Sequence, residues 1–226
     1  MLSGPEGHHA TTVRRLAAGE RADVTDGRGM LAECVVRSAA RGTLELTVVA
    51  RRAEPEPDPR IVVVQAIVKG DRGELAVEIM TEVGVDVVVP WAAERCVARW
   101  HGERAAKALA RWRATAREAA KQSRRARFPE VAAPASTPEV AERVGTASLA
   151  ILLDPEGPAA LGRVPFPPGG DIVLIVGPEG GVSPAEAAVL GEAGAVSTHL
   201  GPGVLRASSA GAIAGALALS GCGRWA

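Results

Sequence analysis

The chain has 226 residues, of which 47% are hydrophobic, with 26 basic and 26 acidic side chains. It is long enough for one large domain or a small domain plus a medium one, each with a buried core. Its cysteines, Cys34, Cys96 and Cys222, are far apart and show no CxxC spacing, which argues against a disulfide scaffold and against a metal site. The N-terminus lacks a charged-then-apolar leader, and the most apolar run, residues 207–220, is too short for a membrane span. We therefore expect a cytoplasmic protein without signal peptide or membrane segment.

Positive charge is concentrated in one part of this neutral chain. Between Arg99 and Arg127 there are ten Arg or Lys residues and two Glu, an excess of eight positive charges. A concentrated basic segment predicts an anionic partner, and a solvated helix face is the alternative interpretation.

The first part of the chain has the pattern of a small β domain. Short runs that alternate or are β-branched occupy residues 20–26, 31–38 and 43–50, with glycine-containing turns between them. These runs predict a small barrel or sandwich. The stretch AEPEPDPR at 53–60 is rich in proline and charge, which is typical of a loop or domain junction.

After the junction, strands and helices alternate. The continuous apolar run at 61–68 predicts a strand that is buried on both faces, and helical spacing of apolar residues marks a long helix at 103–123. This alternation predicts an α/β domain with a mostly parallel sheet. We predict strands at 61–68, 85–91, 148–154, 171–177 and 196–201, and helices at 71–84, 103–123, from Pro184 onward and at 207–220.

Glycine-rich loops follow three of the predicted strands. IVGPEGGVS at 175–183 runs from a strand through a tight turn into the capping box Ser183–Glu186, with Pro184 at the first helical position. HLGPGVLRASSAGAIAG at 199–215 repeats this arrangement, and LLDPEGPAALG at 152–162 is the third strand end. Open α/β sheets bind ligands at the carboxyl ends of their strands, so the three loops predict a pocket there. Ordinary tight connections without a ligand are the alternative.

Common nucleotide-binding motifs are absent from these loops. The chain contains no GxxxxGK[ST], and Arg206 stands where GPGVLR would need the third glycine of GxGxxG. A kinase or nucleotide-dependent dehydrogenase is therefore disfavoured.

The ordered set of motifs matches a known family. GPEGGVSPAE followed by HLGPGVLRASSAGAIA resembles the signature of the bacterial 16S ribosomal RNA uracil-N3 methyltransferases, a branch of the SPOUT class. HHATTVRRLAAGERADVTDGRG at 8–29, KGDRGELAVEIMTEVGVDVVVPWAAERC at 69–96 and REAAKQSRRARFPEV at 117–131 are similar to other segments of that family, in the same order. The resemblance implies a PUA-like β-barrel RNA-binding domain at 1–59. It also implies a SPOUT-type α/β methyltransferase domain at 60–226, with a trefoil knot near its C-terminus.

The resemblance also implies a reaction. Members transfer a methyl group from S-adenosylmethionine to N3 of a specific uridine in 16S rRNA of the small ribosomal subunit, and they act as homodimers. Carried over by position, the cofactor-binding residues are Leu153, Asp154, Gly177, Pro178, Glu179, Gly180, Gly181, Leu200, Gly201, Gly203, Val204 and Leu205.

The chain departs from the family pattern at a few positions. Gly203 stands where an arginine is usual, Ala207-Ser208-Ser209 where Thr-Glu-Thr is usual, Met80 where a lysine is common, and Arg14 where a leucine is usual. The departures near the last loop bear on substrate and efficiency more than on the cofactor.

Methylation at N3 needs stabilisation of negative charge, because uracil N3 is a poor nucleophile until its proton leaves. We expect Arg206 to be the catalytic residue that stabilises this charge, since it lies beside the last loop and stays cationic. Glu179 and His199 are candidates for the base by location. The alternatives are that Glu179 only orders its loop and that His199 is a packed residue at a strand end.

Basic residues in both predicted domains are candidates for RNA binding. We expect contacts to the RNA backbone from the barrel and to phosphates near the active site from the basic segment, which makes binding sensitive to salt. The candidates are His9, Arg15 and Arg28 in the barrel and Arg124, Arg125 and Arg127 in the basic segment.

Three other functions are compatible with parts of this pattern. A SPOUT 2′-O-ribose methyltransferase would usually carry a GNEG-like loop and an Asn-containing final motif, and neither occurs here. A non-catalytic ribosome-assembly factor could keep the same fold. A small-molecule α/β enzyme would leave the basic segment and the barrel unexplained.

Overall fold

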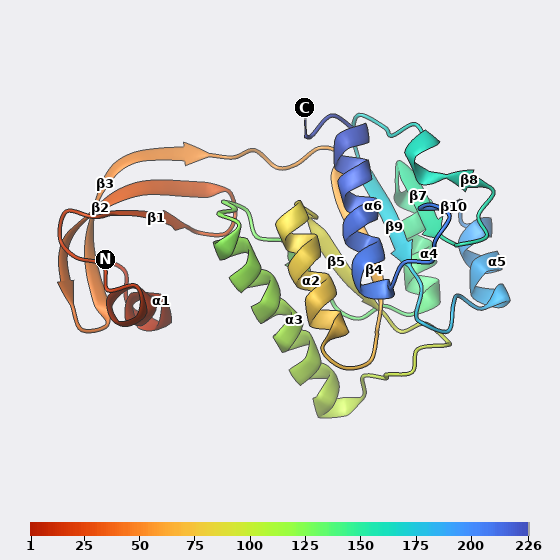
Figure 1. Ribbon diagram of the computed structural model, residues 1–226, viewed down its shortest axis with the longest axis horizontal. Helices are drawn as coiled ribbons and strands as arrows, with labels where there is room; N and C mark the ends of the chain where they lie inside the picture. The colour runs from red at the N-terminus through yellow and green to blue at the C-terminus, as the bar shows by residue number, and fades with distance from the viewer. Residues whose placement is uncertain (226) are drawn as a thin grey trace. The chain divides into compact units, whose positions relative to one another are not determined.

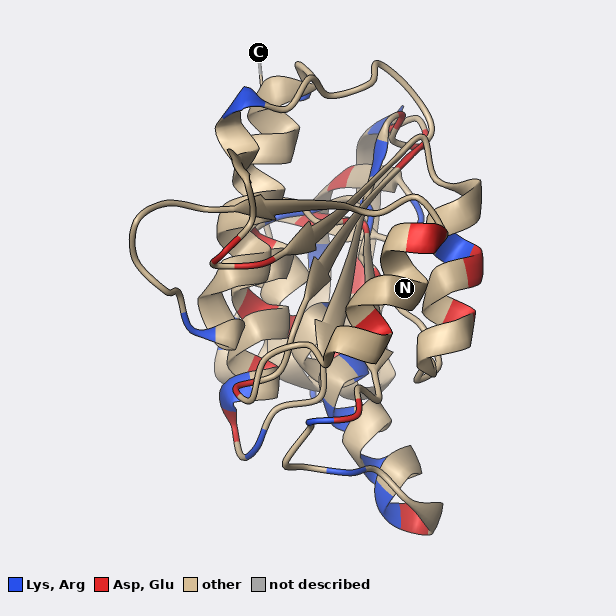
Figure 2. Ribbon diagram, turned by 90° about the vertical axis from the view of Figure 1, so that its right-hand side faces the viewer, with Lys and Arg blue, Asp and Glu red and all other residues tan. Residues whose placement is uncertain are grey.

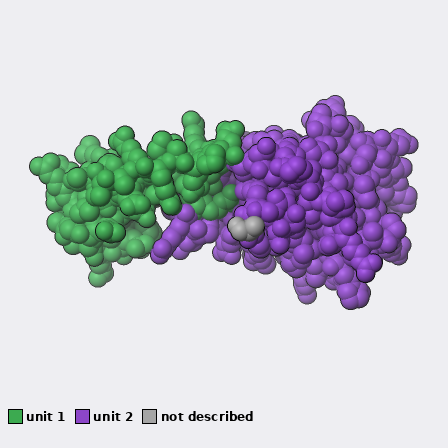
Figure 3. Space-filling view, turned by 90° about the horizontal axis from the view of Figure 1, so that it is seen from above, with its two compact units in different colours: residues 1–56, 125–127 green, residues 57–124, 128–226 purple. Residues whose placement is uncertain are grey.

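A computed structural model describes residues 1–225 and divides the chain into two compact units. Unit 1 consists of residues 1–56 and 125–127, and unit 2 contains the rest of the chain (Figure 3). The functional division at residue 59, with RNA binding assigned to residues 1–59, stays a prediction.

Unit 1 is built on one antiparallel sheet in the order β1-β2-β3. A small apolar cluster of Ala10, Val36 and Leu44 supports it, and Leu2 forms a bridge with Leu44. The strands lie where the sequence predicts them. The elements are α1 (Gly4–His8), the π-helical turn η1 (His9–Val13), β1 (Arg21–Thr25), β2 (Met30–Ala40) and β3 (Thr43–Ala53).

A short segment from the basic part of the chain belongs to unit 1. The carbonyl oxygen of Ala126 accepts hydrogen bonds from the Gly29 N–H at 3.1 Å and from Thr25 Oγ1 at 2.7 Å. The Arg127 guanidinium lies against Gly29, where an added Cβ would be 2.6 Å from Nη2, and it donates to the Glu54 carbonyl at 3.1 Å. Residues 125–127 therefore help to hold this unit together.

Unit 2 contains a seven-stranded sheet in the order β6-β5-β4-β9-β7-β10-β8, and all of its strand pairs are parallel. The central strands are mostly apolar and buried, because helices cover both faces of the sheet. The strands are β4 (Arg60–Ala66), β5 (Val87–Trp91), β6 (Glu130–Val131), β7 (Leu149–Leu153), β8 (Ala159–Ala160), β9 (Asp171–Val176) and β10 (Val196–His199), and the 3₁₀ turn η2 (Leu161–Arg163) follows β8.

Two layers of helices enclose this sheet (Figures 1 and 2). One layer consists of α2 (Arg72–Val83), α3 (Gly102–Gln122) and α6 (Ala207–Gly221), which pack on Ile61, Val63 and other apolar residues of the same face. The other consists of α4 (Thr137–Thr146) and α5 (Pro184–Glu192), which pack on Val62 and Val64. The predicted α/β architecture is confirmed.

Some elements were not predicted from the sequence. β6 and β8 have two residues each, which is too short for any hydrophobic period to show. α4 carries a recognisable start, since Ser136 and Glu139 form a capping box with a proline in the first turn. That pattern was available in the sequence and would have located this helix.

Candidate active site

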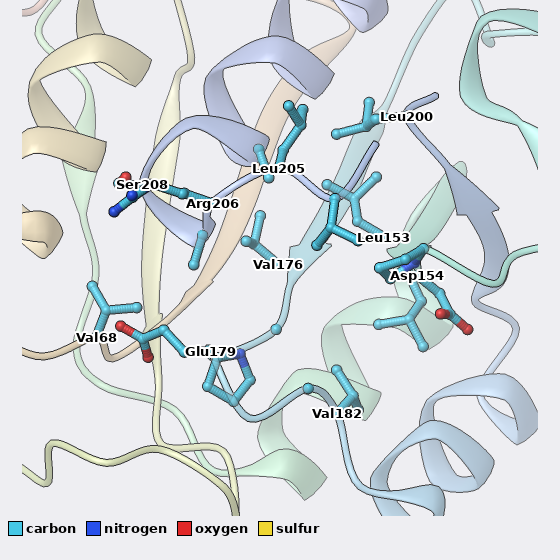
Figure 4. A pocket seen from close by; sticks show the side chains of 18 of the residues that line it. Val68, Leu153, Asp154, Val176, Glu179, Val182, Leu200, Leu205, Arg206 and Ser208 are labelled. Atoms are coloured by element: carbon cyan, nitrogen blue, oxygen red, sulfur yellow. The ribbon is translucent and has the colours of Figure 1, made fainter. Parts of the chain in front are cut away.

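A cavity of about 630 Å³ lies at the carboxyl ends of β4, β7, β9 and β10 (Figure 4). Its wall contains residues from the three glycine-rich loops that follow β7, β9 and β10. The segment after β4 adds Val68 and Arg72, and the start of α6 adds Ala207, Ser208 and Ala210. Parallel strands bring their carboxyl ends to one edge, so loops that are far apart in sequence surround one space.

Every residue predicted to bind the cofactor lines this cavity except Gly180. Gly180 packs on the Arg95 backbone, and an added Cβ would lie 3.3 Å from the Arg95 carbonyl oxygen. Arg95 Nη1 also donates to the Gly180 carbonyl at 3.3 Å. Gly180 therefore permits a close approach between its loop and the Arg95 backbone.

Glycine is required at other points of the same loop for its shape. At Gly177 an added Cβ would lie 2.7 Å from Val182 Cγ2, and Gly181 has a φ of +74°. Both conditions exclude larger residues without movement of the loop.

One part of the cavity wall is apolar. Leu153, Val176, Leu200 and Leu205 extend into it from β7, β9 and the last loop (Figure 4). Val182 adds to this surface from the loop before α5. An apolar wall with a few polar groups beside it is typical of a site for a small organic ligand.

Four charged side chains that line the cavity have no partner within residues 1–225. None of them forms an ion pair or a side-chain hydrogen bond with any described residue; they are Arg72, Glu156, Glu179 and Arg206. Asp154 differs, because its carboxylate accepts from the Glu156 N–H at 2.9 Å and from Ser197 Oγ at 3.2 Å. The four unpaired side chains are therefore available to a ligand, whereas the Asp154 carboxylate shapes its own loop.

Arg72 is the functional candidate that the sequence analysis missed. It is the first residue of α2, it is exposed, and it lines the same cavity as Arg206. The KGDR run that contains it directly follows a buried strand, and a charged run at the carboxyl end of a strand was the signal that could have identified it.

A buried carboxylate holds the helix that follows the β9 loop. Glu186 accepts hydrogen bonds from the Glu94 N–H and from Thr137 Oγ1, both at 2.8 Å. It also completes the predicted capping box with Ser183. Trp91 Nε1 donates to Thr137 Oγ1 at 3.1 Å, so β5, α4 and α5 are tied together behind the cavity.

The two candidate bases are placed differently. Glu179 lines the cavity with its carboxylate on the Val68 side (Figure 4). His199 does not line it. It is half-buried at the end of β10, and its Nδ1 has no hydrogen-bond partner among residues 1–225.

Cysteine chemistry is disfavoured next to this site. Burial raises the pKa of the Cys96 thiol, and the nearby carboxylates of Glu186 and Glu179 raise it further. A neutral thiol is a poor nucleophile.

The basic residues predicted to bind RNA lie in both units. His9, Arg15 and Arg28 are exposed in unit 1, and Arg124 is exposed in unit 2. The Arg127 guanidinium already contacts the protein, since it donates to the Glu54 carbonyl and lies 4.0 Å from the Glu56 carboxylate. Arg125 is half-buried in unit 1.

No group of three or more His, Cys, Asp or Glu residues that could hold a metal ion occurs within residues 1–225. None of the helices described there combines the length and the apolarity needed to cross a bilayer.

Family comparisons agree with this geometry. The family model described as RNA methyltransferase domain matches residues 54–219, and the one described as RNA methyltransferase PUA domain matches residues 2–49. The chain belongs to the RNA methyltransferase family. It is 46% identical over 218 residues to ribosomal RNA small subunit methyltransferase E of Mycobacterium tuberculosis, which covers 95% of this chain and 83% of that protein. The protein of the same name from Bacillus subtilis is 28% identical over 92% of this chain and 85% of its own.

Solved structures of methyltransferases show the same fold. A methyltransferase from Legionella pneumophila, in complex with its bound cofactor SAM, superposes with a TM-score of 0.85 at 27% identity and covers 96% of this chain and 90% of its own. Ribosomal RNA small subunit methyltransferase E from Neisseria gonorrhoeae, bound to S-adenosyl methionine, gives a TM-score of 0.82 at 27% identity over 94% of this chain and 87% of its own. The SPOUT-type α/β fold with an N-terminal PUA-like domain is confirmed.

Proposed function

We propose that this RNA methyltransferase transfers a methyl group from S-adenosylmethionine to N3 of a specific uridine in 16S rRNA of the small ribosomal subunit. The observation that carries the proposal is the single cavity lined by all three glycine-rich loops, which contains both an apolar wall and unpaired charged side chains. It is supported by relatives that are named for the small-subunit RNA.

The cavity residues fit S-adenosylmethionine. Leu153, Val176, Leu200 and Leu205 offer an apolar wall for the adenine ring, and the loop backbone offers hydrogen bonds to the ribose. The bound cofactor supplies an electrophilic methyl group on sulfur. This assignment is supported by the cofactor that is bound in the Legionella and Neisseria structures.

The chain's own residues would activate the uridine. Arg206 would lie beside the base and stabilise the negative charge that spreads onto O2 and O4 when the N3 proton leaves. Glu179 is the base that the geometry favours, because its carboxylate lines the cavity and has no partner among residues 1–225, whereas His199 does not line the cavity. The proton would pass from N3 to the Glu179 carboxylate.

RNA and a second copy of the chain are the proposed partners. The exposed His9, Arg15 and Arg28 would contact the RNA backbone, and the basic segment at 124–127 would contact phosphates. We also propose a homodimer, and a location in the cytoplasm, where ribosomal subunits are assembled.

Mass analysis of methylated nucleosides tests the reaction. The protein is incubated with deuterated S-adenosylmethionine and small subunits that lack the modification, and the RNA is digested to nucleosides. We expect 3-methyluridine that carries the label. A label on ribose would instead support the 2′-O-methyltransferase, whose GNEG-like loop is absent here. No binding of S-adenosylmethionine in calorimetry, together with no transfer, would support the assembly factor.

A further inference from the structure

We propose that Arg72 binds a phosphate of the substrate RNA next to the target uridine and so positions the base in the cavity. This inference rests on the proposed function, since it assigns one contact of that substrate. The residue lies outside the three glycine-rich loops and outside the basic segment at 124–127.

The Arg72 guanidinium has no partner in the protein within residues 1–225. Some other arginines of unit 2 are paired, such as Arg60 with Asp171 at 2.8 Å and Arg111 with Glu74 at 3.1 Å. Glu74, the acidic residue in the first turn of α2, is therefore occupied by Arg111. Arg72 lines a cavity and forms no ion pair or side-chain hydrogen bond within residues 1–225, so its cation is available to a ligand.

The shape and the position of Arg72 favour a phosphate as its ligand. A base that enters the cavity brings its own phosphates to the rim, and Arg72 is an exposed side chain that lines this cavity. The planar guanidinium fork fits a phosphate with two parallel hydrogen bonds. A cofactor carboxylate shares this anionic chemistry, so the test must separate the two sources.

The test compares Arg72→Gln with Arg143→Gln. Arg143 lies in the last turn of α4, a helix of the opposite layer, and does not line the cavity, so it controls for the loss of one charge. Binding of a labelled 16S rRNA fragment is measured by fluorescence anisotropy over a range of salt concentrations. We expect Arg72→Gln to lower the slope of log affinity against log salt by about 0.7, the value for one phosphate contact in single-stranded RNA. Arg143→Gln and Arg72→Lys should keep the wild-type slope.

Two further measurements complete the design. Calorimetry with S-adenosylhomocysteine should give the same affinity for Arg72→Gln and wild type. In methylation assays KM for RNA should rise by about tenfold while kcat changes little, as expected for a uniform binding contact.

An unchanged salt slope in Arg72→Gln overturns the proposal. A loss of S-adenosylhomocysteine affinity also overturns it, because the residue would then bind the cofactor carboxylate. Failure of the wild type to methylate any RNA would overturn the proposed function instead, and the anisotropy slopes would still test Arg72.

Discussion

At the scale of single residues, Arg206 offers the sharpest test of the reaction. Its guanidinium lines the cavity without a partner among residues 1–225, while its backbone carbonyl accepts from the Ser209 and Ala210 N–H groups at the start of α6. Replacement by alanine removes the charge and leaves those backbone bonds. We expect kcat of Arg206→Ala to fall about 10²–10³-fold, the usual cost of losing one group that stabilises transition-state charge.

Single-turnover methylation measures this effect, and calorimetry with S-adenosylhomocysteine shows whether cofactor binding is spared. Arg206→Lys is the matched control, because it keeps the charge and should retain part of the rate. Turnover near the wild-type level in Arg206→Ala would reject the catalytic role.

Gln65 is a second residue whose environment makes a clear prediction. It is fully buried in β4, its Nε2 donates to the Ala66 carbonyl at 3.2 Å, and its Oε1 has no partner among residues 1–225. A buried acceptor without a partner costs about 1–3 kcal/mol, so we expect Gln65→Met to raise the unfolding free energy by about 1 kcal/mol. Urea denaturation measures the difference. A loss of stability would mean that Oε1 has a partner that these contacts do not include.

At the scale of single residues, the sequence located the loops but did not show why each residue is needed. The glycines at 177, 180 and 181 marked the right turn, but a pattern cannot say whether a glycine faces a ligand or, like Gly180, another part of the chain. Met80, which stands where a lysine is common, is fully buried, with its sulfur near Gly211. Both facts depend on tertiary neighbours that are distant in sequence.

At the scale of elements, α6 is a helix whose glycines set its distance from the sheet. An added Cβ at Gly211 would lie 2.9 Å from Met80 Sδ and 3.1 Å from Val63 Cγ1. In α5, by contrast, Gly191 has nothing within 4 Å of an added Cβ. We expect Gly211→Ala to lower the unfolding free energy by about 1–3 kcal/mol through overpacking, and Gly191→Ala to raise it by about 0.5 kcal/mol through helix propensity.

The two variants make the same chemical change in two helices, so they control for each other in urea denaturation. Equal shifts in the same direction would show that close packing of α6 on β4 and α2 does not limit its position.

The long elements were predictable because their periods are strong. The continuous apolar run of β4 and the spacing in α3 were visible in the sequence, and both lie within two residues of the predicted bounds. β6 and β8 consist of two residues each and form only through their neighbours in the sheet. The order of the seven strands depends on long-range pairing, which no local pattern contains.

At the scale of the whole molecule, some cations of the basic segment form contacts within the protein and others are exposed. Arg111 pairs with Glu74, Arg113 Nε donates to the Val131 carbonyl at 3.0 Å, and Lys121 pairs with Glu118. Arg124 remains exposed in this segment. The local excess of positive charge therefore predicted an anionic partner but did not show which cations are free to bind it. The RNA-binding roles of residues 124–127 stay predictions.

The last described turn of the chain is tied to the beginning of unit 2. Arg224 donates to both carboxylate oxygens of Asp86 and, at 3.1 Å, to the Pro59 carbonyl. Asp86 is buried, and its carboxylate also accepts from the Ile61 N–H at 2.8 Å. One cation thus joins the segment after α6 to the starts of β4 and β5.

Removal of Arg224 should leave this buried carboxylate without its cation. We expect Arg224→Ala to lower the unfolding free energy by about 3 kcal/mol, the lower end of the cost of breaking a buried pair, since Arg224 is itself partly exposed. The double variant Arg224→Ala with Asp86→Asn should lose less than the sum of the two single variants, because the charge that needs compensation is then gone. Arg163, exposed in η2, supplies a control whose alanine variant should change stability by less than about 0.5 kcal/mol. If Arg224→Ala costs no more than Arg163→Ala in urea denaturation, the C-terminal segment is held by the packing of α6 and not by this ion pair.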